Sequence, residues 1–510
     1  MQPADEKRSH PRCKAEYPIQ ILLPSSSDEG DIVVPGRTTD ISTSGLGLTL
    51  DSPVRHPSTT LRLRLDAGHP LPALELPGHI VWSAASDHGA TSQCGIRFAP
   101  LSSDQCSAWD SLLSRHDPGP RPLRREDLIP RTALQTERGD LTRAWLSQRL
   151  GVDLEHVATF SFDARTANKN IENLIGACQV PLGITGPLLV NGTDARGLFY
   201  VPFATTEGTL VETYQAGMMA ISRAGGATVH VLNDRVDITS AFILEDLSHA
   251  IRFARWLGEN FDRIKAAAEQ TTRHGELVDL KAQVLGRRVL ASFAYTTGDA
   301  MGLNIITIAT ERACAFIMEQ YPAQKYFLRC NASADKKPSS LSLHRCYGKE
   351  VVADATIPRR VLRRYFGVTP EEVNEFCYTG TMGSIQAGII GLNAHFANGL
   401  AAIYLACGQD IAQVVNSAIG IATAEVTSLG DLYMSVKLPS LIVATVGGGT
   451  QLATQGECLR IMDCYGQGKA RKFSEIIAAS LLAGELAICA ALASGRFVQA
   501  HMRKRMAARA

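Results

Sequence analysis

Four ionisable side chains lie in sequence surroundings that ordinary surface charges seldom have. Glu207 lies in "ATTEGTLVET", and Lys336 lies in the polar stretch "SADKKPSS" between long apolar segments. Asp410 interrupts the apolar, helix-like segment "LACGQDIAQVV", where an unpaired carboxylate would be costly. His501 lies near the C-terminus in "VQAHMRKRM". A solvated loop would also explain Lys336, and a structural pair with a lysine would explain Asp410, so the residues alone leave these alternatives open.

Two segments together could hold a nucleotide, and the three glycines of the second could bring bare backbone close to a diphosphate. The first, "DAMGLN", spans residues 299–304, and the second, "TVGGGT", spans residues 445–450 after an apolar run. Glycine allows this approach because it has no side chain. The chain has neither a GxGxxG after a strand nor a GxxxxGK[ST] loop, so a bound nucleotide must use another kind of site.

A third set of residues near the N-terminus could hold a nucleotide. Arg8 and Arg12 are separated by three residues, and "DISTSG" supplies Asp40, Ser42 and Gly45. Paired guanidinium groups grip phosphate and stack on purines, while Asp and Ser on a turn can bind a base edge. Either pattern alone is weak, because arginine-rich tails and Asx turns are usually only solvated.

The composition indicates a protein with a large core and no general affinity for nucleic acid polymers. Its 510 residues are 45% hydrophobic, and 51 basic residues nearly cancel 50 acidic ones. Twelve cysteines without a CxxC pair predict reduced thiols in the cytoplasm and no metal site. The N-terminus lacks the apolar core of a signal peptide. The run at residues 476–495 contains Glu485 and much alanine, which favours a buried helix over membrane insertion.

The chain divides into two parts that differ in composition and hydrophobic pattern. Residues 1–116 carry short alternating runs such as "GLGLTL" and "LRLRL", which predict a small antiparallel β-barrel or sandwich followed by one helix with a serine cap. Four prolines and alternating charge mark residues 117–132 as a linker. From residue 133 onward, long alanine- and glycine-rich helical stretches alternate with strand-like runs, as in α+β or mixed α/β proteins.

The N-terminal part resembles the PilZ family of cyclic di-GMP receptors. An RxxxR segment precedes the predicted barrel and DxSxxG follows in an early strand and loop, over roughly residues 8–115. The resemblance implies that Arg8 and Arg12 clamp the phosphates and guanines of cyclic di-GMP, while Asp40, Ser42 and Gly45 line the barrel surface. A degenerate barrel that only mediates contacts is the alternative.

The larger part, about residues 125–505, resembles the 3-hydroxy-3-methylglutaryl-CoA reductases. The ordered blocks that carry this resemblance are "ENLIGACQVPLGITGPL", "VPFATTEGTLVET", "GDAMGLN", "DKKPSS", "NAHFANGLAAIYLACGQD", "TVGGGTQL" and "LLAGELAICAALASGRFVQAHM". It implies a homodimer or higher homo-oligomer with the active site between subunits. The implied regions are a helical segment and first part of a large domain at 133–239, a ferredoxin-like cofactor-binding insertion at 240–327, the rest of the large domain at 328–484, and a C-terminal flap at 485–510.

That family reduces a thioester to a primary alcohol with two hydrides from NAD(P)H, and the four ionisable residues fit this chemistry. Lys336 would stabilise negative charge that develops on the carbonyl oxygen. Glu207 would donate a proton to the reduced carbonyl, a role that needs burial or a neighbouring anion. Asp410 would link Glu207 and Lys336. His501 would protonate the departing thiolate.

The resemblance also assigns cofactor contacts. They are Asp299, Met301, Gly302 and Asn304 in the first glycine-rich segment, Val446, Gly447, Gly448 and Gly449 in the second, and Arg273 in "TTRHGELVDL". Arg273 occupies the position where NADPH-using members carry an arginine for the ribose phosphate, which favours NADPH over NADH.

Departures from the family pattern concentrate around the substrate. An arginine expected after "VLND" is Ile238, a serine position is Arg329, and a lysine position is Tyr378. Two arginines expected to contact coenzyme A phosphates are replaced by Ala216 and Met219. The substrate contacts that remain are Asn331, Lys337 and Asn398, with Arg329 as a candidate to restore positive charge. The sequence therefore leaves open a different acyl thioester or carrier, or a catalytically dead scaffold in a cyclic di-GMP signalling protein.

Overall fold

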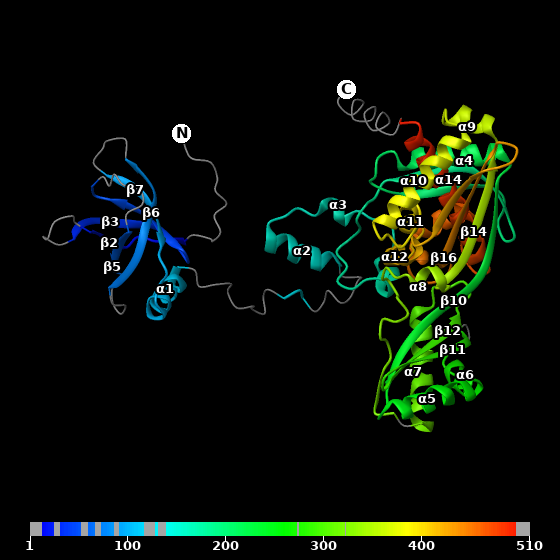
Figure 1. The fold of residues 1–510 in the computed structure, drawn as a ribbon, viewed down its shortest axis with the longest axis horizontal. Helices are drawn as coiled ribbons and strands as arrows, with labels where there is room; N and C mark the ends of the chain where they lie inside the picture. The colour runs from blue at the N-terminus through cyan, green and yellow to red at the C-terminus, as the bar shows by residue number, and fades with distance from the viewer. Residues whose placement is uncertain are drawn as a thin grey trace. The chain divides into compact units, whose positions relative to one another are not determined.

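The structure is a computed structural model, and it describes residues 13–24, 31–52, 60–66, 73–85, 91–116, 128–130, 139–272, 275–321 and 323–495. The chain forms two compact units, residues 1–128 and 129–510 (Figure 1). The predicted site residues Arg8, Arg12, Arg273 and His501 lie outside the described residues.

The first unit is a closed antiparallel β-barrel, as the alternating runs predict. The strands follow the order β1-β3-β2-β5-β6-β7-β4, and pairing of β3 with β4 closes the barrel. Strict alternation places the leucines of "TLRLRL" inside and its arginines outside. The strands are β1 (Cys13–Lys14), β2 (Pro18–Leu23), β3 (Ile32–Ser42), β4 (Gly45–Leu50), β5 (Thr60–Leu65), β6 (Leu74–Ala85) and β7 (Ser92–Phe98).

Helix α1 (Ser103–His116) packs on this barrel. The predicted serine cap is confirmed: Gln105 N donates to Ser102 Oγ at 3.3 Å, and Ser102 N donates to Gln105 Oε1 at 2.9 Å, which is a capping box. The buried Trp109 donates its indole N–H to the carbonyl of Ser42 at 3.0 Å, so the helix is tied to the β3–β4 turn.

The second unit is built on a mixed sheet with the path β11-β12-β10-β14-β16-β15, to which β8, β9 and β13 add. The strands are β8 (Leu182–Gly192), β9 (Arg196–Ala204), β10 (Ala227–Ile243), β11 (Glu276–Leu285), β12 (Arg288–Thr296), β13 (Lys325–Phe327), β14 (Gly348–Ile357), β15 (Ile421–Val426) and β16 (Leu432–Leu441). The helices are α2 (Gly139–Leu150), α3 (Glu155–Ala158), α4 (Leu210–Ala224), α5 (Leu247–Glu259), α6 (Phe261–Glu269), α7 (Leu303–Gln320), α8 (Leu341–His344), α9 (Arg359–Tyr365), α10 (Pro370–Gln386), α11 (Phe396–Ala406), α12 (Val414–Ser417), α13 (Ala453–Ile461) and α14 (Ala470–Ala493).

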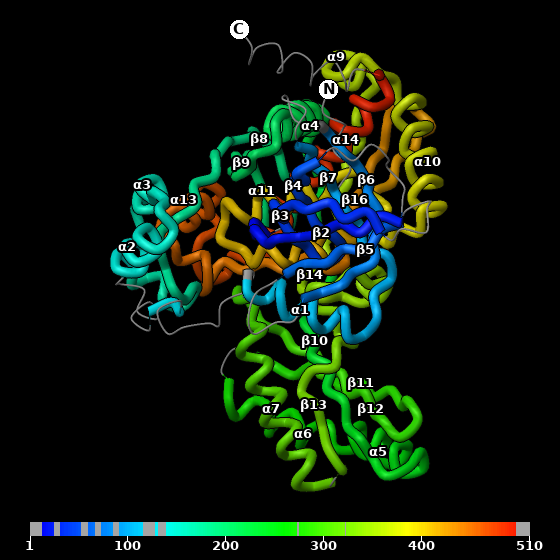
Figure 2. Tube along the Cα trace, turned by 90° about the vertical axis from the view of Figure 1, so that its left-hand side faces the viewer, coloured from blue at the N-terminus to red at the C-terminus, as the bar shows by residue number. Residues whose placement is uncertain are grey.

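Strand β10 belongs to two hydrophobic cores. Its first half pairs with β14 in the larger core, and its second half pairs with β12 and β13 in the smaller one. Helices α5, α6 and α7 gather with β11 and β12 at the far end of β10, away from α4, α10 and α14 (Figures 1 and 2). This smaller core occupies the part of the chain where the family resemblance implies a cofactor-binding insertion.

The apolar run near the C-terminus forms most of α14, and the prediction of a buried helix is confirmed. This helix is long and apolar enough to cross a membrane, yet most of its residues are buried against α4, α11 and the sheet. It runs without interruption through Glu485, which is 1% exposed. The expected boundary of the C-terminal flap at residue 485 therefore falls inside a core helix.

Candidate active site

A strained loop carries Lys336. Three non-glycine residues, Asn331, Ala334 and Lys336, adopt positive φ angles of 65°, 57° and 55°. Such backbone is costly for residues other than glycine and persists only where surrounding contacts impose it. One such contact is a buried hydrogen bond in which Asn416 Nδ2 donates to the carbonyl of Ala334 at 2.8 Å.

Asp335 is the second anchor of this loop. Gln413 Nε2 donates to its Oδ1 at 2.9 Å, and Arg329 Nη1 donates to its Oδ2 at 3.2 Å. Arg329 also donates to Thr307 Oγ1 at 2.8 Å, so its guanidinium is already engaged in this chain. Lys337 is exposed, and its Nζ donates to the carbonyl of Asp335 at 3.2 Å. Of the two adjacent lysines, Lys337 is the one without a carboxylate partner among the described residues.

Lys336 forms an ion pair with Asp410. Its Nζ lies 2.6 Å from Asp410 Oδ2, and the two side chains remain 39% and 26% exposed. Asp410 also accepts the backbone N–H of Ala412 at 3.1 Å and begins the 3₁₀ turn Ile411–Gln413. The carboxylate is thus held by its own turn, and it fixes the lysine in a solvent-accessible position.

Glu207 has a different partner. Both of its carboxylate oxygens accept from Asn398 Nδ2, at 3.0 and 2.9 Å, and its backbone N–H donates to Thr205 Oγ1 at 2.9 Å. Glu207 precedes α4 in a tight turn in which Thr209 has a φ of 77°. Asn398 lies in the first turn of α11 and holds the carboxylate against this helix.

The expected direct link between Glu207 and Lys336 through Asp410 is not formed within one chain. Asn398 lies near the start of α11 and Asp410 lies beyond its end, so ~12 Å of helix axis separates the partners of the two groups. Among the described residues, no hydrogen bond or ion pair joins Glu207 to Lys336 or Asp410. One chain therefore holds two separate half-sites, Glu207 with Asn398 and Lys336 with Asp410.

A buried titratable cluster lies behind Glu207. Glu485 accepts the backbone N–H groups of Ala394 and His395 at 2.9 and 2.7 Å, and burial raises its pKa to about 7. The ring of His395 stacks on Tyr214 with centroids 5.2 Å apart. Burial lowers the pKa of His395 to about 4, although the nearby Glu207 charge opposes this shift. The cluster sets the start of α11 and hence the position of Asn398.

Glu485 and His395 have opposite effects on stability between about pH 4.5 and 6.5. In the folded chain Glu485 keeps its proton up to about pH 7, but in the unfolded chain it releases it near pH 4.5, so this group destabilises the fold as pH rises. His395 stays unprotonated down to about pH 4 when folded but takes a proton near pH 6.5 when unfolded, so it destabilises the fold as pH falls. The two slopes offset each other.

Replacing Glu485 by glutamine should remove its contribution to the pH dependence of stability and leave only that of His395. Relative to the wild type, the free energy of unfolding of Glu485→Gln should rise by about 3 kcal/mol from pH 4.5 to 6.5, since two pKa units are worth about this much. Urea unfolding over this pH range, followed by a signal from the second unit, measures the effect. His395→Gln is the reverse control and should lose stability over the same range. Parallel curves for all three proteins would refute this account.

The two glycine-rich segments lie together. Thr445 N donates to the carbonyl of Asp299 at 2.9 Å. The Asp299 carboxylate accepts the backbone N–H groups of Gly468, Lys469 and Ala470 at 2.7, 3.0 and 3.0 Å, and so caps the start of α14. In this chain Asp299 thus has a structural role that its place in the motif did not predict.

The second segment has the bare backbone that a diphosphate requires. Gly447 and Gly448 have φ angles of 74° and 54°, and a Cβ at either would meet nothing within 4 Å. Gly449 packs on Gly408, since a Cβ on Gly408 would lie 2.3 Å from the Gly449 carbonyl oxygen. Asp410 follows Gly408 by two residues. The open glycine turn is therefore joined directly to the segment that holds Lys336.

The other predicted cofactor contacts lie around this turn and the first segment. Gly302 has a φ of 72° and precedes α7, in whose first turn the exposed Asn304 lies. Met301 and Val446 are half-buried. Among the described residues, no group of three or more His, Cys, Asp or Glu side chains could hold a metal ion.

On the barrel, the DxSxxG residues form the β3–β4 turn. Ser42 is 3% exposed and donates its hydroxyl to the Gly45 carbonyl at 3.0 Å, so its side chain does not line the surface as expected. A Cβ on Gly45 would lie 2.0 Å from the Ile96 carbonyl oxygen, which explains the glycine. Asp40 is half-buried and pairs with Gly47 across the strands.

Sequence reasoning missed the polar residues that shape the Lys336 loop. Gln413 and Asn416 are both 0% exposed, and each donates to this loop. Their signal in the sequence was two amide side chains three residues apart in an apolar segment, immediately after Asp410.

Family models match both parts of the chain. The model of hydroxymethylglutaryl-coenzyme A reductase matches residues 140–506, and the model of the PilZ domain matches residues 6–115.

Relatives match along most of their length. The 3-hydroxy-3-methylglutaryl-coenzyme A reductase of Methanocaldococcus jannaschii is 43% identical over 372 residues, which cover 71% of this chain and 91% of that protein. The reductase of the same name from Pyrococcus horikoshii is 42% identical over 371 residues, which cover 71% and 90%. The class II 3-hydroxy-3-methylglutaryl-CoA reductase from Streptococcus pneumoniae, solved with NADPH bound in open conformations, has a TM-score of 0.54 at 20% identity. It covers 70% of this chain and 97% of that chain, and it shares the fold.

Proposed function

Because the chain belongs to the hydroxymethylglutaryl-coenzyme A reductase family of oxidoreductases, we propose that it reduces 3-hydroxy-3-methylglutaryl-CoA to mevalonate with NADPH. One observation carries this proposal. The open glycine turn at Gly447–Gly448 packs through Gly449 on the segment of Asp410, which in turn holds Lys336. A site for a diphosphate and a fixed cation for a carbonyl oxygen are therefore parts of one structure.

Bound NADPH would supply the hydride, and the glycine turn fits its diphosphate because no side chain fills the space. Gly302, Asn304 and Arg273 would complete its binding site. Each remaining step needs a group of this chain. Lys336, held by Asp410, stabilises the charge that develops on the carbonyl oxygen during hydride attack. His501 protonates the departing thiolate.

We propose that the proton donor for the carbonyl comes from a second copy of the chain. Glu207 is exposed and lies at the opposite end of α11 from the Lys336 pair, so one chain neither buries it nor brings it to the same carbonyl. We therefore propose a homodimer or higher homo-oligomer in which Glu207 of one copy faces Lys336 of another. The closed site would exclude water and give Glu207 the burial that proton donation needs.

The N-terminal unit is a PilZ domain, and we propose that it binds cyclic di-GMP through Arg8, Arg12 and Asp40. Its ligand could change the reductase rate only by binding two states of the protein with different affinity. We place the whole protein in the cytoplasm, with its cysteines reduced, since all twelve are free.

The direct test is an assay of the purified full chain with 3-hydroxy-3-methylglutaryl-CoA and NADPH. Formation of mevalonate with two NADPH consumed per thioester would support the proposal. NADPH binding without turnover of this thioester would favour a different acyl thioester or carrier. Absence of both binding and turnover would favour the scaffold interpretation. The same assay at saturating cyclic di-GMP tests regulation, and an unchanged rate would contradict it.

A further inference from the structure

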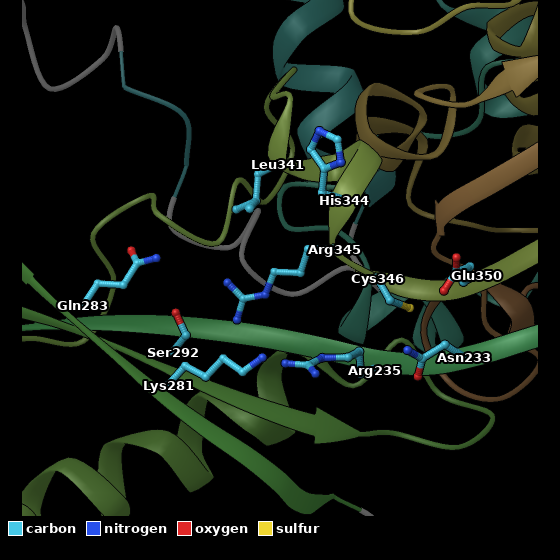
Figure 3. A pocket seen from close by; sticks show the side chains of 10 residues that line it. All are labelled: Asn233, Arg235, Lys281, Gln283, Ser292, Leu341, His344, Arg345, Cys346 and Glu350. Atoms are coloured by element: carbon cyan, nitrogen blue, oxygen red, sulfur yellow. The ribbon is translucent and has the colours of Figure 1, made fainter. Parts of the chain in front are cut away.

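A polar cavity of about 350 Å³ opens between β10, β11, β12 and the segment Leu341–Cys346 (Figure 3). Its size falls in the range of small-molecule sites. Its walls, however, are mainly polar and charged rather than apolar. A cavity of this kind suits a small, strongly hydrated ligand more than an apolar one.

Three cationic side chains converge on this cavity. The nitrogen-bearing ends of Arg235, Lys281 and Arg345 turn toward one another, from β10, β11 and the end of α8 (Figure 3). Like charges repel, so this arrangement is costly unless anions lie between them. The chain supplies two such anions: Asp237, paired with Arg235 and Arg345, and Asp279, 3.5 Å from both Arg235 and Lys281.

These carboxylates do not use up the donors. Asp237 is 1% exposed, whereas the Arg235 and Arg345 side chains paired with it are 18% and 22% exposed. Glu350 also lines the cavity, but Lys437 already pairs with it at 2.7 Å. In the part of the chain that the structure describes, the buried atoms Arg345 Nη2 and Asp237 Oδ2 both lack a hydrogen-bond partner, and they belong to the same ion pair. The side chains nevertheless stay partly open to the cavity: Arg235 is 18%, Arg345 22% and Lys281 69% exposed.

The cavity lies next to the loop that carries Lys336. A smaller cavity is lined by Ser333 and Ala334 of that loop, and Leu341 and Arg345 line both cavities. Arg345 therefore stands between the cationic cavity and the strained backbone that presents Lys336. A ligand that draws the Arg345 guanidinium outward would act on the wall that supports this loop.

From the convergence of cations, their remaining exposure and the open volume, we infer that this cavity is a binding site for a small oxyanion, a carboxylate or phosphate group held by Arg345, Arg235 and Lys281. Guanidinium groups bind both through paired N–H donors, so the recognition chemistry is shared. A purely structural ion-pair network is the competing explanation, and it predicts no saturable ligand.

Titration calorimetry of the full chain tests this inference, with glutarate as the carboxylate probe and inorganic phosphate as the phosphate probe. Saturable binding of one of them is expected for the wild type. Arg345→Gln should weaken that binding by about 10-fold or more, because a charge-assisted donor pair is lost. Lys281→Gln removes one charge from a side chain that is 69% exposed, so it should weaken the binding of the probe by a few-fold. This variant tests the site if Arg345→Gln folds poorly.

Arg312→Gln is the matched control, since it removes an equally charged side chain from α7 that does not line the cavity. It should bind as the wild type does. Tighter binding of glutarate than of phosphate assigns the site to a carboxylate ligand, and the reverse assigns it to a phosphate ligand. Absence of saturable binding of either probe to the wild type, or equal affinity in Lys281→Gln and Arg312→Gln, would overturn the inference.

Discussion

Replacing Lys336 by alanine should lower the turnover number of the reductase by about 10²- to 10³-fold, with little change in NADPH affinity. The loss is large because a fixed donor to a developing oxyanion contributes far more in a closed site than in water. NADPH affinity should hold because the glycine turn at Gly447–Gly448 contacts the Asp410 segment through Gly449, not through the lysine. Steady-state kinetics and NADPH fluorescence titration measure the two quantities.

Lys337 is the matched control for this experiment. It is the neighbouring lysine, it is exposed, and within the described part of the chain its Nζ donates to the carbonyl of Asp335 and to no carboxylate. Lys337→Ala should change the Michaelis constant for the thioester more than the turnover number. Equal losses of turnover in Lys336→Ala and Lys337→Ala would mean that the loop as a whole, rather than the cation on Asp410, is what the reaction needs.

Mixing two inactive variants should restore activity if the reaction site is shared between subunits. Glu207→Gln and Lys336→Ala should each be nearly inactive alone. In a mixed dimer, one of the two shared sites contains both substitutions. The second site contains an intact Glu207 from the Lys336→Ala copy and an intact Lys336 from the Glu207→Gln copy. With random pairing, about a quarter of wild-type activity should return. The physical reason is that α11 separates the two half-sites within one chain.

The mixture should be prepared by co-expression or by unfolding and refolding the variants together. The control is a mixture of Lys336→Ala with Asp410→Asn, which disables the same half-site twice and should stay inactive. If the first mixture also stays inactive although mixed oligomers form, then Glu207 and Lys336 must act within one chain, and the shared-site proposal fails.

Local patterns predicted much of the fold because their causes are local. The period-two run "LRLRL" places leucines inside the barrel, and Ser102 with Gln105 starts α1 as a capping box. The alanine-rich run with Glu485 forms a buried helix because the carboxylate finds two backbone N–H donors at the start of α11. Those donors lie some ninety residues earlier in the chain, so the sequence indicated a buried helix but not its partner.

The features of the site that the sequence could not predict depend on contacts between residues far apart in the chain. The ion pair of Lys336 with Asp410 fits the predicted chemistry, but the placement of Glu207 at the other end of α11 depends on how that helix lies against α4. Likewise, the family resemblance assigned Asp299 to the cofactor site, but it did not predict that the carboxylate caps α14. Ser42 is buried for a similar reason, since α1 covers the turn that its motif forms.

The seventeen-residue strand β10 has a consequence for how the second unit comes apart. Residues Thr228–Arg235 pair with β14 and residues Val236–Ile243 pair with β12, so the smaller core has no sheet of its own without a strand that also completes the larger one. Melting of either core removes the hydrogen-bond partners from half of a strand whose other half belongs to the other core, so order in one half of β10 supports order in the other. The two cores therefore stabilise each other through one strand, and loss of the part implied to bind the cofactor should lower the free energy of unfolding of the catalytic part.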